Sequence, residues 1–557
     1  MTGTISPASI PSSRQPLEYA VQVDLLLTNA RIHTMSDAHP RAESLAVLNG
    51  RVVALDEDVP AARTVDLGGR TVVPGFHDAH NHMAMSGMRL REIDLSYPAI
   101  RTLDELYDAV KRAAAEIGPG EWIIGSGYDQ NKLGGDHPTR ARLDEIAPRH
   151  LVWLKHTSGH MCVVGGAVLD AADLDAVPEG GVVVRDDEGV PTGLLLEQAQ
   201  ELVQRMVKPY STGVLTECIA AASTQYAAEG LVAVTECGVG GGWVGNSPVE
   251  AAAYQRALAE GRLLQRVSLM PVSDALHEVE RSEDEGSAYG MDLGVHTGFG
   301  SDRLRLGAMK VFSDGSLIGH TAAMFEPFAN SPGNSGFLQD EVENLRDMIL
   351  GAHLAGWQVA THAIGDRAVS TVIDIYSEVL AEYPRENHRH RIEHCGVCRP
   401  EDVERIAALG LVPTPQGRFI TEIGDGMIEA LGPERTAWCY RGQSFLDAGV
   451  TLTGSSDRPV VLGAPLLGIQ AMVTRRTSGG QLLAADEAVS AYDALRAYTL
   501  GSAYASFLDD VSGSLEVGKY ADLVVLGADP LEVDPETIGE ITVDATLLAG
   551  ELTHGEL

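Results

Sequence analysis

The sequence predicts an α/β protein: a (β/α)8 barrel of the TIM type with a β-sandwich domain assembled from the N- and C-terminal segments. Three observations support this fold. Short strand-like runs occur at both ends of the 557-residue chain, strand-like and helix-like segments alternate between them, and polar residues gather where several interior strands end. The first pattern indicates a shared β-domain, the second a barrel, and the third a site at the mouth of that barrel.

The two ends of the chain have similar sequence patterns, in which short strand-like runs are separated by turn residues. Residues 1–20 are rich in Ser and Pro, lack the apolar centre of a secretory signal, and are expected to form a disordered tail. Strand-like runs separated by turn residues then follow at 23–27, 44–48, 51–55 and 70–73, with Asn49-Gly50 as a hairpin turn. The run from Gly513 to Leu526 returns to this pattern. We therefore predict one composite β-sandwich made of residues 21–73 and 512–557.

The interior alternates apolar or β-branched runs with helical segments. The candidate strands are 71–80, 231–237, 266–272, 305–312, 357–362, 390–395, 411–416 and 451–456. Helices are expected between several of them, at 342–355, 368–382 and 400–409. Eight such units make a (β/α)8 barrel over residues 74–511. The first two strands are too far apart for one helix, so we predict an insertion at about 94–212.

Composition limits the kinds of partner. The chain has 78 acidic and 41 basic residues, a formal net charge of −37, which disfavours binding to nucleic acid. No apolar run approaches 18 residues, so no transmembrane helix is expected. Six sparse cysteines fit a reducing, cytoplasmic compartment, and the lone pair Cys395 and Cys398 is read as coincidence. We expect a small-molecule substrate, and assembly into a homo-oligomer is left open.

Metal-ligating side chains stand where the candidate strands end. His80 and His82 alternate on one strand, so both imidazoles can reach one point, as a zinc-type ion requires. The fourth strand carries Lys310, and three further strands end in the residues His362, His394 and Asp457. Reactive groups of a (β/α)8 barrel sit at these carboxyl ends. Each piece is weak alone, but the whole set predicts a metal site.

At this point the chain resembles a known family, the amidohydrolase superfamily of metal-dependent hydrolases, and within it the branch of the N-substituted formamide deformylases. The resemblance rests on motifs along nearly the whole chain. They are PGFHDAHNH (74–82), SGYDQN (126–131), HTSGHMCVV (156–164), MKVFSDGSL (309–317), THAIGDRAV (361–369), RIEHC (391–395), GSSDRPV (454–460) and GSLEVGKYADLVVL (513–526). The resemblance implies a barrel with a flanking β-sandwich and a metal centre at its mouth.

The resemblance also implies roles for individual residues. The expected metal ligands are His80, His82, Lys310, His362, His394 and Asp457. Asp457 would also be the proton shuttle. Lys310 would react with carbon dioxide to give a carbamate that bridges two metal ions, because an ammonium group has no lone pair to offer. The alternative is a charged Lys310 paired with Asp314 or another carboxylate. One or two divalent ions, zinc first, are therefore expected per chain.

Other motif residues have less certain roles. The resemblance places His160 at the substrate cavity, although it could equally be a satisfied core histidine. His320 stands where many relatives have an arginine, and it is a further catalytic candidate. Glu236 could support a metal ligand, Arg458 could orient Asp457 or face solvent, and Asp366 could cap the next helix. The glycine-rich run 238–242 is weak evidence for phosphate binding.

We therefore expect a hydrolase of a carbon–nitrogen bond other than a peptide bond, acting on an amide or N-substituted formamide of a small molecule through metal-activated hydroxide. The alternative is a hydrolase or deaminase of a cyclic amide, lactone or heterocycle on the same metal site. A non-catalytic scaffold is disfavoured, because all six ligand positions are filled.

Overall fold

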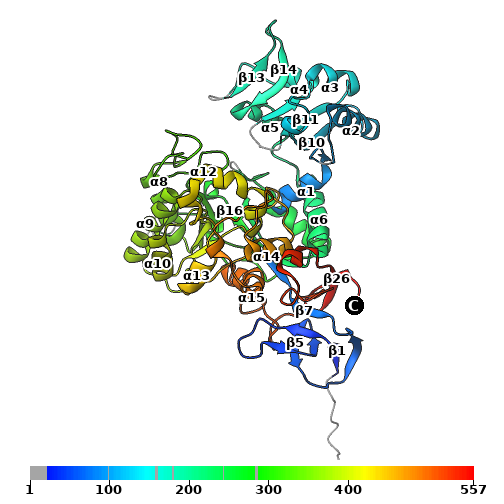
Figure 1. Cartoon of the computed structure of the whole chain (residues 1–557), viewed down its shortest axis with the longest axis vertical. Helices are drawn as coiled ribbons and strands as arrows, with labels where there is room; N and C mark the ends of the chain where they lie inside the picture. The colour runs from blue at the N-terminus through cyan, green and yellow to red at the C-terminus, as the bar shows by residue number, and fades with distance from the viewer. Residues whose placement is uncertain are drawn as a thin grey trace, which may run out of the picture.

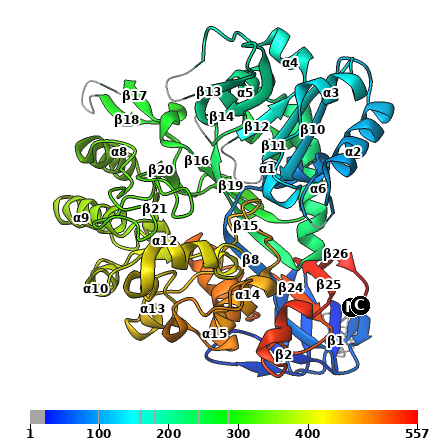
Figure 2. The same cartoon turned by 45° about the horizontal axis from the view of Figure 1, so that its top comes forward.

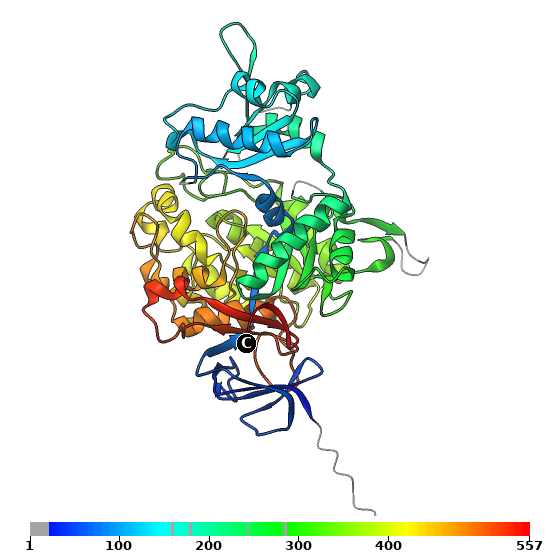
Figure 3. The same cartoon turned by 90° about the vertical axis from the view of Figure 1, so that its right-hand side faces the viewer.

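The computed structural model describes residues 22–557 apart from 98, 157–160, 178–180, 242–243, 281 and 283–286. Along its long axis the molecule has three regions (Figures 1 and 3). A small α/β region stands at one end, the parallel sheets with their helices lie in the middle, and a β-domain lies at the other end.

The β-domain is built from both ends of the chain. One sheet, in the order β5-β4-β1-β6, contains β1 (Val23–Thr28), β4 (Leu45–Leu48), β5 (Arg51–Leu55) and β6 (Ala61–Asp66). The other, in the order β26-β25-β24-β7-β2-β3, contains β2 (Arg31–His33), β3 (Arg41–Ala42), β7 (Thr71–Pro74), β24 (Leu523–Leu526), β25 (Val543–Leu548) and β26 (Glu551–Gly555). One apolar cluster unites Leu27, Leu45 and Val72 with Leu523 and Leu547.

The predicted hairpin turn is confirmed. Asn49 and Gly50 connect β4 to β5 with φ of 51° and 76°. Two successive positive φ angles are typical of the turn that matches the twist of a two-residue hairpin.

The expected single strand 71–80 is instead two strands, which is a correction. β7 pairs antiparallel with β24, with Val72 opposite Val525, whereas β8 (Phe76–Asn81) pairs with a different sheet. The break falls at Gly75, where a Cβ atom would lie only 2.3 Å from Cγ1 of Val232. The Gly75 N–H donates to the carbonyl of Asp522 (2.9 Å). A residue without a side chain therefore lets one run of apolar residues pass from one sheet to the next.

The middle region contains two parallel four-stranded sheets. The first, in the order β19-β16-β15-β8, adds β15 (Leu231–Val239), β16 (Arg266–Pro271) and β19 (Leu304–Leu306) to β8. The second, in the order β20-β21-β22-β23, contains β20 (Met309–Phe312), β21 (Val359–Ala363), β22 (Arg391–His394) and β23 (Val412–Thr414). Seven of the eight predicted strands therefore fall in parallel ladders, as in a TIM-barrel-type α/β fold.

The two sheets approach each other at two seams. At the first, β19 and β20 belong to different sheets although they follow each other along the predicted strand 305–312, and a single bridge joins Lys310 to Val272. At the second, a bridge joins Ser455 to Gln416 on one side, and Ala79 N–H donates to Gly454 O (3.0 Å) on the other. Within the described residues, these ladders do not form one continuous closed barrel.

The expected eighth strand, 451–456, is not a strand, which is a second correction. Its backbone groups have other partners: Gly454 N–H donates to Ala497 O (3.0 Å), and Gly454 O accepts from the Ser502 hydroxyl (2.8 Å). The following helical segment therefore takes hydrogen bonds that a ladder would use.

Helices cover the parallel sheets. They include α6 (Thr212–Ala228), α7 (Glu250–Ala259), α8 (Val342–Leu354), α9 (Asp366–Glu382), α10 (Pro400–Leu409), α11 (Gly417–Glu422), α12 (Gly424–Thr436), α13 (Gln443–Asp447), α14 (Pro465–Thr474), α15 (Ala491–Arg496) and α16 (Ser502–Ala505). The three helices predicted beside strands five to seven match α8, α9 and α10 to within two residues. The ends of α10 could be predicted because both carry clear sequence signals. The helix begins at Pro400, and it ends before Gly410, which has a φ of 65°.

The region predicted as an insertion folds around its own sheet, in the order β13-β14-β12-β11-β10-β9. Its elements are β9 (Ile93–Asp94), α2 (Leu103–Glu116), β10 (Trp122–Tyr128), α3 (Arg140–Ile146), β11 (Leu151–His156), β12 (Met161–Val164), α4 (Gly166–Ala171), β13 (Val182–Arg185), β14 (Pro191–Leu196) and α5 (Glu201–Val207). Helix α1 (Met83–Arg91) leads into it directly from β8 (Figure 1).

A separate hairpin, β17 (His277–Glu280) and β18 (Ser287–Gly290), lies beside α8 (Figure 2). No helix among the described residues is both long and apolar enough to cross a membrane.

Candidate metal centre

His80 and His82 converge on Asp457. The Nε2 atoms of His82 and His80 lie 3.0 Å and 3.4 Å from Oδ1 of Asp457. Tetrahedral zinc with Zn–N distances near 2.0–2.1 Å places its ligand atoms about 3.3 Å apart. All three side chains are largely buried, and their ligand atoms lie within 4.8 Å of one another. These three groups therefore fit a divalent ion in both chemistry and spacing.

A buried carboxylate orients His80. Nδ1 of His80 hydrogen-bonds to Glu393, and Arg391 pairs with both oxygens of that carboxylate (2.7 and 2.9 Å). Burial alone would raise the pKa of Glu393, but Arg391 and His80 outweigh it and hold the pKa well below its usual range. Glu393 is therefore ionised and holds the proton of His80 on Nδ1, which leaves Nε2 for a metal ion.

Of the remaining two predicted histidine ligands, His394 lies beside His80 and His362 lies beside His394. The ring of His394 is centred 4.8 Å from that of His80 and 4.5 Å from that of His362. Nδ1 of His394 lies 2.7 Å from the side-chain oxygen of Gln416, so it carries the proton and Nε2 is left as the lone-pair nitrogen. Burial, with His362 and His80 nearby, lowers the pKa of His394 well below its usual value. His394 is therefore neutral, as a ligand must be.

His80 and His82 differ in charge preference. Burial lowers the pKa of His82. For His80 burial acts in the same direction, but Cys237, Glu393 and Asp457 outweigh it and the pKa is raised well above 6.5. The carboxylates of Glu393 and Asp457, which favour a proton on His80, equally favour a metal cation in its place.

Lys310 lies deep in the same region. It is 1% exposed, and its Nζ lies 4.9 Å from the centre of the Phe312 ring. In the part of the chain that the structure describes, the side chain of Lys310 makes neither a hydrogen bond nor an ion pair. The Lys310 side chain is therefore buried beside the predicted ligands without a carboxylate partner among the described residues.

The alternative pairing of Lys310 with Asp314 is not observed. Asp314 accepts the N–H groups of three residues at 2.8–3.0 Å: Ala323, Ile364 and Gly365. Its Oδ1 also lies 3.3 Å from Nε2 of His362. Asp314 thus organises the loops after β20 and β21 and contacts a predicted ligand.

The two additional catalytic candidates are placed differently. His160 lies outside the described residues. His320 lies in the loop after β20, with φ of 53°, and its ring packs 4.9 Å from that of Phe328. No contact among the described residues joins His320 to the five converging side chains.

Three weaker candidates have structural partners. Arg458 is 5% exposed and pairs with Glu229 (2.7 Å), so it neither faces solvent nor contacts the carboxylate of Asp457. Glu236 accepts the N–H of Met83, and burial, with Glu250 nearby, raises the pKa of Glu236 to about 8.

Asp366 accepts the N–H groups of Phe325 and Arg367 (2.9 and 2.8 Å) at the start of α9. Asp366 is the first residue of α9, whose N-cap is Gly365, so it does not cap the helix as expected but fixes the loop that contains Phe325. The paired cysteines Cys395 and Cys398 are buried free thiols.

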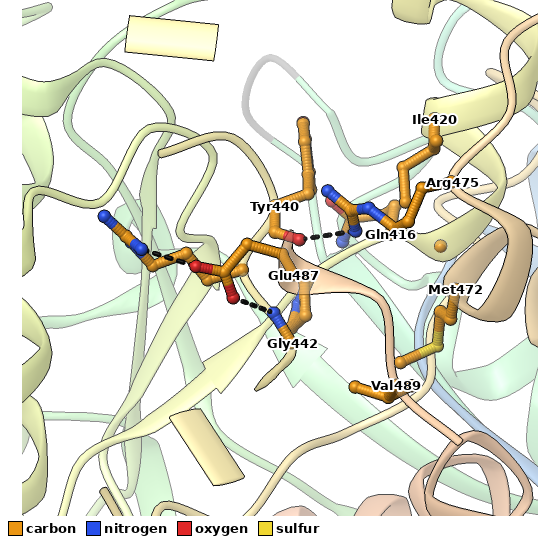
Figure 4. A pocket seen from close by; sticks show the side chains of 11 residues that line it. Gln416, Ile420, Tyr440, Gly442, Met472, Arg475, Glu487 and Val489 are labelled. Carbon is orange, nitrogen blue, oxygen red and sulfur yellow. Dashed lines mark hydrogen bonds and ion pairs between the residues drawn. The ribbon is translucent and has the colours of Figure 1, made fainter. Parts of the chain in front are cut away.

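Two supporting residues escaped the sequence reasoning. Glu393 lies inside the quoted motif RIEHC, and its alternation with Arg391 on one strand was a usable signal. Gln416 had no such signal, because its contact with His394 depends on how β23 ends. Gln416 borders a small cavity (Figure 4) in which Arg475 donates to the carbonyl of Tyr440 and Glu487 accepts from Gly442 N–H. This second layer of polar contacts lies behind Gln416.

Comparisons with known proteins agree with this geometry. The N-substituted formamide deformylase of Arthrobacter pascens is 30% identical over 559 residues, covering 95% of this chain and 98% of that protein. Protein LONG AFTER FAR-RED 3 of Arabidopsis thaliana is 31% identical over 91% of this chain and 87% of its own. An uncharacterized metal-dependent hydrolase from Pyrococcus horikoshii superposes with a TM-score of 0.75 at 27% identity, over 92% of this chain and 99% of its own.

The family comparison covers most of the chain. Residues 63–554 match the sequence model of the Amidohydrolase family. That stretch begins in β6, includes every predicted metal ligand and ends in β26. The chain belongs to the amidohydrolase family and is a hydrolase acting on carbon–nitrogen bonds.

Proposed function

We propose that the protein hydrolyses a small-molecule amide, with an N-substituted formamide as the first candidate substrate. The observation that carries this proposal is the convergence of His80, His82 and Asp457 on one point, with their ligand atoms within 4.8 Å. The 30% identity to an N-substituted formamide deformylase over nearly the full length of both chains supports the choice of substrate.

The proposed metal ion is zinc, held by His80, His82, His394, His362 and Asp457. The donor set is rich in imidazole, which suits zinc. Such an ion polarises a carbonyl group and lowers the pKa of water toward about 7. Lys310 is proposed to join the site as a carbamate formed with carbon dioxide, since it is buried and has no carboxylate partner among the described residues.

Asp457 is proposed to move the proton. Its Oδ1 is shared by His80 and His82, whereas Oδ2 has no hydrogen-bond partner among the described residues. Burial would raise the pKa of Asp457, but the charge of His80 and the hydrogen bonds from His80 and His82 outweigh it and hold the pKa well below 3.8. Asp457 is therefore ionised at the start and can take a proton from the attacking water on Oδ2. Delivery of that proton to the nitrogen lets the amine leave, because an unprotonated amine is a poor leaving group.

We further propose that the two parallel sheets and the segment 451–457 together act as the (β/α)8 barrel of this family. Ala79 N–H to Gly454 O (3.0 Å) and Asp457 N–H to His80 O (2.8 Å) support this, since they connect the segment to β8. His160 stays a proposed residue of the substrate cavity.

The test is a substrate panel assayed with zinc-loaded protein: N-substituted formamides, larger acyl amides, cyclic imides, lactones and aminopurines. We expect release of formate and amine from the formamides, with loss of activity after chelation and recovery on adding zinc. Turnover of lactones or aminopurines alone would move the protein to the alternative substrate classes. Lack of any zinc binding would contradict the proposed site itself.

A further inference from the structure

We propose that Asp78 is a positioning residue that fixes the strand bearing His80 and His82 against the turn bearing Asp457. The inference rests on the proposed metal site, which it deepens. Asp78 lies on β8 within the motif PGFHDAHNH, is 2% exposed, and is not part of the converging group.

The Asp78 carboxylate has four donors, which come from two distant parts of the chain. Oδ1 accepts the N–H groups of His80 (3.1 Å) and Ser456 (3.0 Å). Oδ2 accepts from the Ser456 hydroxyl (2.5 Å) and the Asn81 side-chain amide (2.7 Å). One side chain thus joins a metal ligand to the residue that precedes another ligand. A carboxylate has about four acceptor positions, so this one is fully used.

Asn81 and Ser456, the hydrogen-bond partners of Asp78, have further partners of their own. Asn81 accepts a hydrogen bond from the Tyr226 hydroxyl (2.7 Å), and the guanidinium of Arg458 lies 4.5 Å from the centre of the Tyr226 ring. The Ser456 hydroxyl also accepts the Arg458 N–H (3.1 Å). Asp78, Asn81 and Ser456 are buried, and both oxygens of the Asp78 carboxylate are satisfied, which is the condition under which buried polar groups define one geometry.

The turn at Asp457 needs such a clamp for two reasons. The segment 451–456 is not a strand, so it lacks the ladder that fixes the other ligand-bearing segments. Asp457 also has φ of 57°, a left-handed conformation that persists only where the surroundings impose it. Apart from Asp78, three backbone hydrogen bonds tie the turn to β8 and its end: Asp457 N–H to His80 O (2.8 Å), His82 N–H to Arg458 O (3.0 Å) and Ala79 N–H to Gly454 O (3.0 Å). The Asn81 side-chain amide also donates to the Ser456 hydroxyl (3.5 Å). The spacing of the three ligand atoms therefore depends on Asp78.

The experiment compares zinc affinity, thermal stability and kinetics of the full chain with those of Asp78→Asn and Ser456→Ala. An amide at position 78 places an NH2 group against the Asn81 donor, so the hydrogen bonds that Oδ2 of Asp78 now accepts are disrupted. We expect zinc affinity to fall about 10–100-fold, as when outer partners of metal ligands are removed. At saturating zinc we expect kcat to fall more than KM changes, because the proton shuttle is misplaced while the substrate cavity is not.

Asp529→Asn is the matched control. Asp529 is also a buried carboxylate, 6% exposed, but it pairs with His33 in the β-domain (2.8 Å). Both variants can lower the Tm of the zinc-free protein. Only Asp78→Asn should shrink the rise in Tm that zinc produces, since that rise reports binding to the folded state.

The outcomes separate the two proposals. Wild-type affinity and an undiminished rise in Tm in Asp78→Asn would overturn the positioning role while leaving the metal site standing. Failure of the wild-type chain to bind zinc would instead overturn the proposed function. If Asp78→Asn does not fold, Ser456→Ala decides: a several-fold loss of zinc affinity supports the role, and unchanged affinity overturns it.

Discussion

Two of the proposed metal ligands have a backbone conformation that most residues avoid. His394 and Asp457 have φ of 69° and 57°, and Cys395 continues with 45°. In a regular strand, Glu393 and His394 would point to opposite faces. The left-handed turn at His394 lets Glu393 reach His80 while His394 itself lies next to the same ring. Strain of this kind, on the order of 1–3 kcal/mol per residue, gathers at functional sites.

At the residue scale, Asp457→Asn should separate metal binding from catalysis. Asparagine keeps the size and one oxygen but cannot carry the proton, so turnover should fall by roughly 10²–10⁴-fold. The histidines should keep most of the metal. Steady-state kinetics and metal analysis on the same preparation check this. Near wild-type turnover would remove Asp457 as the shuttle and turn attention to His160 and His320.

Lys310→Ala tests the proposed carbamate. If the modified lysine bridges two ions, its loss should reduce the metal content from two ions per chain to one or none. Metal analysis of both proteins, prepared with added bicarbonate and zinc, gives the count. The Lys155→Ala protein, which loses a lysine on β11 in the separate six-stranded sheet, serves as a control and should keep its metal. An unchanged count in Lys310→Ala would place that lysine outside the site.

At the element scale, Gly75 separates the β-domain from the parallel sheets. Strand β7 belongs to one and β8 to the other, and the chain passes Val232 with no room for a side chain. The residue that precedes the ligand-bearing strand by one position therefore fixes where that strand starts. His80 and His82 owe their placement partly to this close approach.

Gly75→Ala should lower the free energy of unfolding by about 1–3 kcal/mol, the usual cost of overpacking. The added Cβ would lie 2.3 Å from Val232 Cγ1, so the strands must move apart. Gly213→Ala is the control, because it lies in α6 and its Cβ would meet only Ser211 Oγ, at 3.9 Å. Urea unfolding compares them. Equal stability of the two variants would show that the contact at Gly75 relaxes without cost.

The sequence predicted most elements and ligands, and its failures have physical causes. Apolar periodicity located β15, β16 and β21, and strand ends located His362 and His394, since these depend on local pattern. The pattern could not show that Gly75 splits a strand, because the obstruction is Val232, more than 150 residues away. Nor could the pattern show that the Gly454 N–H donates to the carbonyl of Ala497 rather than to a neighbouring strand. The partners of His394 and of Asp78 are likewise set by tertiary contacts.

At the scale of the whole molecule, several buried histidines are uncharged and form hydrogen bonds between segments that are far apart in the sequence. His77 hydrogen-bonds to Ser512 (3.1 Å), whose hydroxyl donates to Asp522, at the junction of the parallel sheets and the β-domain. Burial lowers the pKa of His77 to about 4. Burial also lowers the pKa of His353 and, much further, that of His390, which share a hydrogen bond (2.9 Å).

These shifts predict loss of stability in mild acid. Above pH 6.5 His77 is neutral in both the folded and unfolded chains and contributes no pH dependence. Between pH 6.5 and about 4 the unfolded chain takes a proton that the folded chain refuses, so stability falls, by up to about 3 kcal/mol for this one group. Zinc-free His77→Gln should therefore lose less stability than wild type between pH 7.5 and pH 5 in urea unfolding.

The exposed His277 provides the control for that measurement, because its side chain is 50% exposed. His277→Gln should keep the wild-type dependence on pH. The same dependence in His77→Gln would mean that His77 is not responsible for the loss in acid.

The pairing of β7 with β24 has a consequence for how the protein is made. Thr71 lies opposite Leu526, so the partner of an early strand leaves the ribosome about 450 residues later. At a synthesis rate of about 5–20 residues per second, that delay is roughly 20–90 s. During this time the edge of β7, with its apolar Val72 and Val73, has no partner on that side, and unpaired edges of this kind recruit other chains. The nascent protein is thus exposed to aggregation until β24 has been translated, and we expect its folding during synthesis to benefit from a chaperone that covers this edge.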